Sequence, residues 1–118
     1  LIPFDNAASP WRERALPLDR ASRDAALGVI RALKPGGGTN IYDPLELALL
    51  DPSIDTVYLL SDGAPGSGKF VREDDILREV RKLNAVRRVA IHTISIGVES
   101  PLMKKLAEEN GGRAVVVK

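Results

Sequence analysis

The sequence predicts an α/β fold: a doubly wound, mostly parallel sheet with helices on both faces. Apolar runs that favour strands alternate along the chain with amphipathic stretches of helical period. The runs at residues 56–60 and 89–96 are apolar at successive positions, which is typical of strands buried on both faces of a parallel sheet. Strands joined through helices need right-handed crossovers, and these place the strands parallel to one another.

In the first half of the chain the pattern predicts a strand at residues 1–4, helices at 19–34 and 41–50, and a strand from residue 56. Asp19 is a suitable N-cap for the first helix. Its apolar stripe follows helical spacing and is expected to be buried; it comprises Ser22, Ala26, Val29, Ile30 and Leu33. The following proline and glycines, residues 35–38, end this helix and form a loop.

The second half predicts a charged amphipathic helix over residues 72–86, a strand over 89–96, a helix through 110 and a strand over 113–117. Ser100 and Pro101 are good N-cap and first-turn residues for the last helix. Gly111 and Gly112 fit a left-handed cap at its end. The chain therefore supplies four expected strands.

Composition narrows the functional classes. The chain has 118 residues, enough for one core, with 17 basic and 16 acidic side chains and a net charge of +1. This near-equal number of basic and acidic side chains gives no sign of a nucleic-acid partner. No cysteine is present, which removes thiolate chemistry and leaves the compartment undetermined, and no apolar run is long enough to span a membrane. Because the chain starts at Leu1 inside an expected strand, we expect residues 1–118 to be a single partial domain.

One loop suggests nucleotide binding. Gly63, Gly68 and Lys69 match the spacing of a phosphate-binding loop, and the loop follows a strand. In nucleotide hydrolases the next residue is Ser or Thr, whose hydroxyl binds Mg²⁺, but here it is Phe70. A nucleotide-binding enzyme that uses residues 63–69 therefore stays an alternative, beside a simple surface turn.

A second candidate site combines Thr39 with Asp62. Asp62 directly follows the strand from residue 56, and Thr39 follows a run of glycines. In an open α/β sheet, ligands bind beyond the carboxyl ends of the strands. A hydroxyl and a carboxylate are hard oxygen donors suited to Mg²⁺, although both could equally cap turns. Ser61 and His92 could suggest a hydrolase, but Ser61 lacks the turn of a nucleophile elbow.

The combined motifs resemble a known family. The segments GGGTNIYDPLELAL, DTVYLLSDG, VAIHTISIG and LAEENGGRAVVV are together similar to the von Willebrand factor type A domain, particularly its bacterial forms. The resemblance implies a metal-ion-dependent adhesion site, in which three loops hold a divalent cation that binds a carboxylate of a partner protein. Thr39 matches its second loop and Asp62 its third, and Asn40, Ser61 and Gly63 would shape the loops around them.

The chain departs from this family in one respect. The first loop of the site, Asp-x-Ser-x-Ser, occurs nowhere in the 118 residues. The resemblance therefore implies that the family's first strand is missing, that Mg²⁺ (or Mn²⁺ or Ca²⁺) binds weakly or not at all, and that unpaired strand edges favour self-association. We expect a non-enzymatic interaction module that binds a protein ligand presenting Asp or Glu. A structural domain with a vestigial metal site is a third hypothesis.

Overall fold

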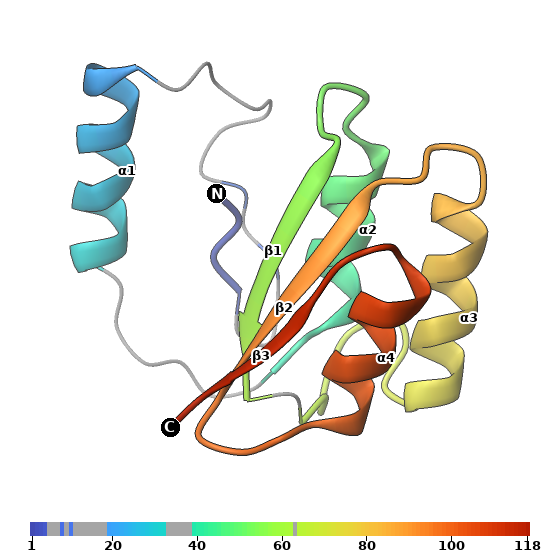
Figure 1. Ribbon diagram of the computed structural model, residues 1–118. Helices are drawn as coiled ribbons and strands as arrows, with labels where there is room; N and C mark the ends of the chain where they lie inside the picture. The colour runs from blue at the N-terminus through green and yellow to red at the C-terminus, as the bar shows by residue number, and fades with distance from the viewer. Residues whose placement is uncertain (5–7, 9, 11–18, 33–38, 63) are drawn as a thin grey trace.

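The computed structural model describes residues 1–4, 8, 10, 19–32, 39–62 and 64–118. Helices alternate with the strands of a parallel sheet, which confirms the α/β fold class (Figure 1). The elements are α1 (Arg20–Ala32), α2 (Tyr42–Leu50), β1 (Thr56–Ser61), α3 (Glu73–Asn84), β2 (Ala90–Ile96), α4 (Pro101–Glu109) and β3 (Ala114–Val117). Within these described ranges no helix is both long and apolar enough to cross a bilayer.

The sheet has three strands in the order β1-β2-β3, and both pairs are parallel. Tyr58 lies opposite His92, and Ile94 lies opposite Val115. Consecutive strands are joined through α3 and α4, the helical crossover that parallel neighbours need. Among the described residues, β1 and β3 are therefore the two edges of the sheet.

The predicted strand at residues 1–4 is wrong. This segment is extended, but it forms only an isolated antiparallel bridge between Phe4 and Ala8 and does not join the sheet. A strand exists only through its pairing with a neighbour, and Pro3 offers no N–H for such pairing. The segment instead lies across a groove from β1.

The hydrophobic core fills one side of the sheet. Three helices, α2, α3 and α4, pack there against β1 and β2 (Figure 1). The most deeply buried members come from the three helices and β2, and β1 contributes Leu59; they include Leu45, Ile76, Val80, Ile91, Leu102 and Leu106. Ala48, Leu49, Leu77 and Met103 are also buried. This helical face follows the period of about 3.6 residues on which the prediction rests.

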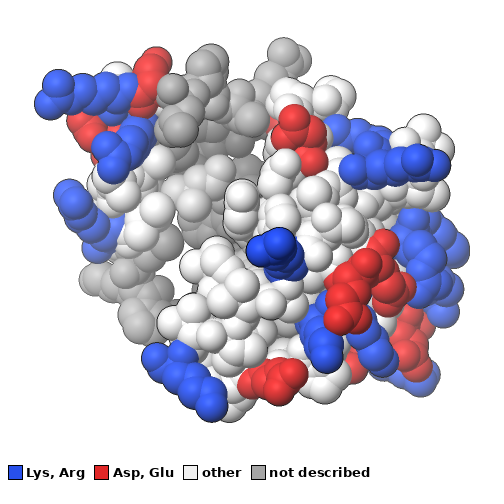
Figure 2. Space-filling view, viewed as in Figure 1, with Lys and Arg blue, Asp and Glu red and all other residues white. Residues whose placement is uncertain are grey.

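On the other side of the sheet, several large side chains of the described strands are exposed. Tyr58 is 67% exposed and Leu60 51% exposed, so the expectation that β1 is buried on both faces is wrong. On β3 all four residues are exposed. The charged side chains gather around the rim of the view in Figure 2, whereas the surface over the strands is mostly uncharged.

Helix α1 does not bury its predicted stripe. None of its residues is buried, and Ile30 is 47% exposed. The helix stands apart from the sheet, on the far side of the N-terminal segment (Figure 1). Its amphipathic pattern is real, but burial needs a facing surface, which the sheet does not provide at this position. Leu33 and residues 35–38 lie outside the described residues.

Several helix ends follow the sequence signals. The Asp19 carboxylate accepts a hydrogen bond from the Ser22 amide at 2.7 Å, and the Ser22 hydroxyl accepts one from the Asp19 amide at 3.0 Å, a reciprocal N-terminal cap. The Ser100 hydroxyl likewise accepts from the Met103 amide at 3.3 Å. Gly111 has a φ of +70° and ends α4 as a left-handed cap.

Candidate functional site

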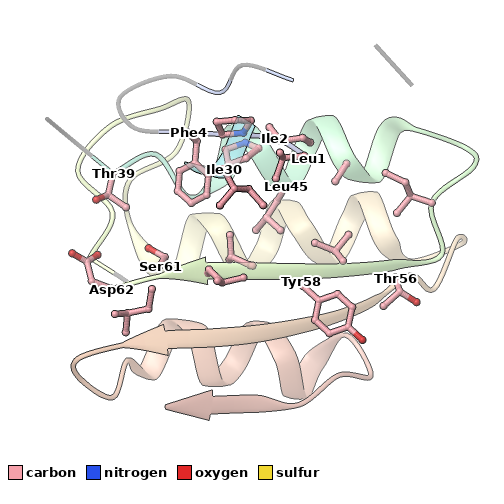
Figure 3. Close-up of a pocket in the computed structure, with 18 residues that line it drawn as sticks. Leu1, Ile2, Phe4, Ile30, Thr39, Leu45, Thr56, Tyr58, Ser61 and Asp62 are labelled. Atoms are coloured by element: carbon pink, nitrogen blue, oxygen red, sulfur yellow. The ribbon is translucent and has the colours of Figure 1, made fainter. Parts of the chain in front are cut away.

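A groove of about 720 Å³ runs along the outer edge of β1. Thr39, Ser61 and Asp62 lie at the end where β1 finishes, and residues 1–4 form the opposite wall (Figure 3). Most of the lining is apolar, and Asp62 is the one charged side chain among the described lining residues. The groove therefore places a small polar group at the carboxyl end of a parallel strand, where α/β sheets bind ligands.

Backbone hydrogen bonds join the Thr39 segment to the loop after Asp62. The Thr39 carbonyl accepts from the amide of Gly66 at 2.9 Å and from the amide of Ser67 at 3.2 Å. The Asp62 carboxylate accepts from the amide of Ala64 at 3.2 Å, which makes a tight Asx-type turn at the start of this loop. These bonds hold the two predicted site residues at the same end of the groove.

Asn40 fixes the start of α2. Its side-chain oxygen accepts from the Asp43 amide at 3.0 Å, and its side-chain nitrogen donates to the Asp43 carboxylate at 2.8 Å. Gly68 packs against this side chain with a φ of +104°, and a Cβ there would lie 2.2 Å from the Asn40 oxygen. Only glycine suits both the backbone conformation and the close approach. Asn40 therefore links the start of α2 to the backbone at Gly68; its predicted role beside a cation stays a prediction.

Lys69 makes its polar contacts with side chains of α2. Its amide donates to the Asp43 carboxylate at 3.1 Å, and its ammonium group pairs with Glu46. The hydrogen bond with Glu46 raises the pKa of Lys69. Helix α3 begins only at Glu73, so no helix N-terminus abuts Lys69 as a phosphate-binding loop requires. The loop of residues 64–69 gives the nucleotide-binding alternative no geometric support.

Ser61 and His92, the other candidate residues, lie within the sheet and contact neighbouring residues. Ser61 is 8% exposed and lies opposite Ser95 of β2. His92 lies opposite Tyr58, three positions earlier, so it is about 10 Å along the strands from Ser61. Its Nδ1 accepts from the Arg113 amide at 3.0 Å and its ring stacks on Tyr58, with ring centroids 5.0 Å apart. These positions do not assemble a hydrolase triad. Gly63 lies outside the described residues.

The donors at this end of the groove have the chemistry that a hard divalent cation needs, but they are few. The Asp62 carboxylate is exposed and the Thr39 hydroxyl is half-buried. In the parts of the chain that the structure describes, no group of three or more His, Cys, Asp or Glu side chains could hold a metal ion. Mg²⁺ keeps several waters and accepts few protein ligands, so Thr39 and Asp62 fit part of its coordination shell.

Sequence reasoning missed the amides that connect the two loops. Gly66 and Ser67 contribute backbone N–H groups, which carry no side-chain signal. The sequence pattern assigns Gly68 to a phosphate-binding spacing, whereas in the structure Gly68 packs on Asn40.

A comparison with known families finds that the profile of the von Willebrand factor type A domain matches residues 1–116. Among curated proteins, the chain is 29% identical over 117 residues to von Willebrand factor A domain-containing protein 3A of Homo sapiens, covering 96% of this chain and 10% of that protein. It is also 29% identical over 128 residues to inter-alpha-trypsin inhibitor heavy chain H2 of Sus scrofa, covering 97% of this chain and 14% of that protein.

The chain thus spans only a small part of these relatives, 10% and 14% of their lengths. Both relatives are mammalian, and the expected bacterial type stays a prediction. The family match covers nearly the whole chain.

Proposed function

This chain belongs to the von Willebrand factor type A domain family, and we propose that it is a protein-interaction module whose contact point is a divalent cation at the carboxyl end of β1. Thr39 would bind the cation directly, and Asp62 directly or through water. When bound, the cation supplies an open coordination position for a carboxylate of the partner protein. Asn40, Ser61 and Gly63 would shape the surrounding loops.

The observation that carries the proposal is the pair of hydrogen bonds from the Gly66 and Ser67 amides to the Thr39 carbonyl. They fix the Thr39 segment to the loop that follows Asp62, so two hard oxygen donors share one end of the groove. Without a cation, the Asp62 carboxylate would repel a carboxylate of the partner protein, because like charges repel at short range. A cation between the two carboxylates would turn this repulsion into attraction.

The small number of oxygen ligands determines the Mg²⁺ affinity that we expect. Two protein ligands leave most of the coordination shell to water, so we expect weak, millimolar Mg²⁺ binding in this chain. Further oxygen ligands, as the resemblance implies for the family's first loop, would be needed for tight binding.

Calorimetric titration with MgCl₂ tests the proposal. Asp62→Ala should abolish the binding heat, because it removes the one carboxylate among the described residues that line the groove. Asp55→Ala is the matched control: Asp55 is also exposed but flanks β1 at its other end, where it accepts from the Thr56 hydroxyl at 3.1 Å. Equal Mg²⁺ binding by the wild type and Asp62→Ala would refute the site. No Mg²⁺ binding by the wild type would support the vestigial hypothesis instead.

A further inference from the structure

We propose that Asp43 is the positioning residue of the cation site, because its carboxylate joins the Thr39 segment to the loop that follows Asp62. This inference rests on the proposed function, since it concerns the same site. Thr39 and Asp62 lie at one end of the groove (Figure 3), and Asp43 is not among the residues that line it. Asp43 would therefore act through the loop and not as a ligand of the cation.

The Asp43 carboxylate accepts hydrogen bonds from two different parts of the chain. One oxygen accepts from the side-chain nitrogen of Asn40 at 2.8 Å, and the other accepts from the backbone amide of Lys69 at 3.1 Å. Asn40 directly follows Thr39, whereas Lys69 lies 26 residues beyond Asp43, in the loop after Asp62. The carboxylate therefore bridges the two segments that contain the candidate cation ligands.

The start of α2 holds the Asp43 side chain in place for this bridge. The Asp43 amide donates to the side-chain oxygen of Asn40 at 3.0 Å, so two hydrogen bonds connect these two residues. Asn40 is 1% exposed, which shields the pair from competing water. Hydrogen bonds to an ionised carboxylate are roughly twice as strong as those between neutral groups. The Asn40–Asp43 pair is therefore a firm support for the loop.

Asp43 adds a directional contact to a loop that apolar packing also attaches to α2. The ring of Phe70 packs edge-on against Tyr42, with ring centroids 4.7 Å apart. Apolar packing has no preferred direction, whereas the hydrogen bond to Asp43 fixes the position of the Lys69 backbone. Without the carboxylate, the loop would stay attached at Phe70 but could shift relative to the Thr39 segment.

Glu46 offers a comparison on the same helix. It lies about one turn after Asp43 and pairs with the ammonium group of Lys69, whose side chain is 59% exposed. An exposed ion pair contributes little to stability. Because Glu46 contacts the end of a long side chain and Asp43 contacts the backbone, only Asp43 should determine where the loop lies.

Amide hydrogen exchange in EDTA tests the bridge without a cation. The amides of Gly66 and Ser67 donate to the Thr39 carbonyl, so their protection reports how closely the loop stays beside that segment. Measured relative to the amides of β2, their exchange should accelerate at least about tenfold in Asp43→Ala. Asp43→Asn, which keeps one acceptor oxygen, should give a smaller acceleration. Glu46→Gln is the matched control and should change the exchange by no more than about twofold.

Broadening of amide signals by Mn²⁺, in the same variants, tests whether the bridge positions the cation ligands. The wild type and Glu46→Gln should show broadening at Thr39 and Asp62 together. In Asp43→Ala the broadening at Thr39 should be lost, because the loop no longer holds Asp62 beside it. If Asp43→Ala does not fold, Asp43→Asn serves for both measurements, since it removes the charge and one of the two hydrogen bonds.

The outcomes separate this role of Asp43 from the cation site itself. Unchanged exchange of the Gly66 and Ser67 amides in the Asp43 variants, or equal acceleration in Glu46→Gln, would overturn the inference. Faster exchange with broadening that persists at both ligands would overturn only the positioning role and leave the cation site standing. No broadening in the wild type would overturn the cation site and, with it, this role of Asp43.

Discussion

The carbonyl oxygen of Thr39 lies 2.9 Å from the amide nitrogen of Gly66 and accepts its hydrogen bond. This bond connects two segments that are far apart in the sequence and that contain the two candidate cation ligands. Gly66 follows Asp62 by four residues, so the loop after β1 must fold back towards the start of α2. The geometry of the proposed site therefore depends on the conformation of a loop that carries almost no charge.

The first prediction concerns this loop. Gly68→Ala should lower the free energy of unfolding by about 2 kcal/mol or more, because Gly68 has a φ of +104° and its Cβ would overlap the Asn40 side chain. Gly66→Ala is the matched control, since a Cβ there meets nothing within 4 Å and its N–H is kept. It should change stability by no more than about 0.5 kcal/mol. Urea denaturation of the two variants measures both values, and a similar loss in both would contradict the packing of Gly68 on Asn40.

A second prediction concerns Asn84, a buried amide at the end of α3. Its side chain accepts from the Val89 amide at 2.7 Å and donates to the Val89 carbonyl at 2.8 Å. Asn84→Ala would leave both backbone groups of buried Val89 without these partners and should cost about 2–3 kcal/mol in thermal or urea unfolding. Lys82→Ala, on the exposed face of the same helix, should change stability by less than about 0.5 kcal/mol. An Asn84→Ala protein as stable as the wild type would contradict this role.

The third prediction concerns pH and the start of α1. The hydrogen bond from the Ser22 amide lowers the pKa of Asp19. The Asp19 carboxylate therefore binds a proton less readily in the folded helix than in the unfolded chain. The stabilisation of the helix by this carboxylate is present above the usual aspartate pKa, and it is lost as pH falls through the lowered pKa. Carbon chemical shifts of α1 should report fraying in acid. Asp19→Asn, whose side chain does not ionise, should remove this pH dependence of fraying. If the pH dependence persisted in Asp19→Asn, it would come from another titrating group.

The fourth prediction separates cation binding from nucleotide binding. Lys69 pairs with Glu46, so Lys69→Ala should leave Mg²⁺ binding unchanged in the calorimetric titration. ATP in excess over Mg²⁺ should cause no shift of the amide signals of residues 64–69. Localised shifts that disappear in Lys69→Ala would instead support the phosphate-binding alternative.

Local sequence signals predicted most of the fold because they act over a few residues. The caps at Asp19 and Ser100 and the left-handed Gly111 come from residue chemistry that needs no distant partner. The parallel pairing of β1 with β2 follows from the crossover through α3. By contrast, the exposure of Tyr58 and Leu60 depends on which segments cover the sheet, and the apolar run itself does not encode that.

The candidate cation site stays a prediction, and the sequence accounts for only part of its geometry. Parallel topology places Asp62 at the carboxyl end of β1, whereas Thr39 follows no strand of the described sheet and borders the groove at that end through its own loop. The amides of Gly66 and Ser67 that tie their loops together were not predictable, since backbone donors are the same in every residue except proline. The wrong prediction of a strand at residues 1–4 has a related cause, because a β-favouring segment becomes a strand only when it pairs with a neighbouring strand.

Paramagnetic broadening by Mn²⁺ tests most directly whether Thr39 and Asp62 share a cation. In amide spectra of the ¹⁵N-labelled chain, low concentrations of Mn²⁺ should broaden the signals of Thr39, Asp62, Ala64 and Gly66 before others. Excess Mg²⁺ should restore these signals, and Asp62→Ala should prevent the broadening while Asp55→Ala should not. Broadening centred on another acidic cluster, or at Asp62 without Thr39, would contradict a shared site.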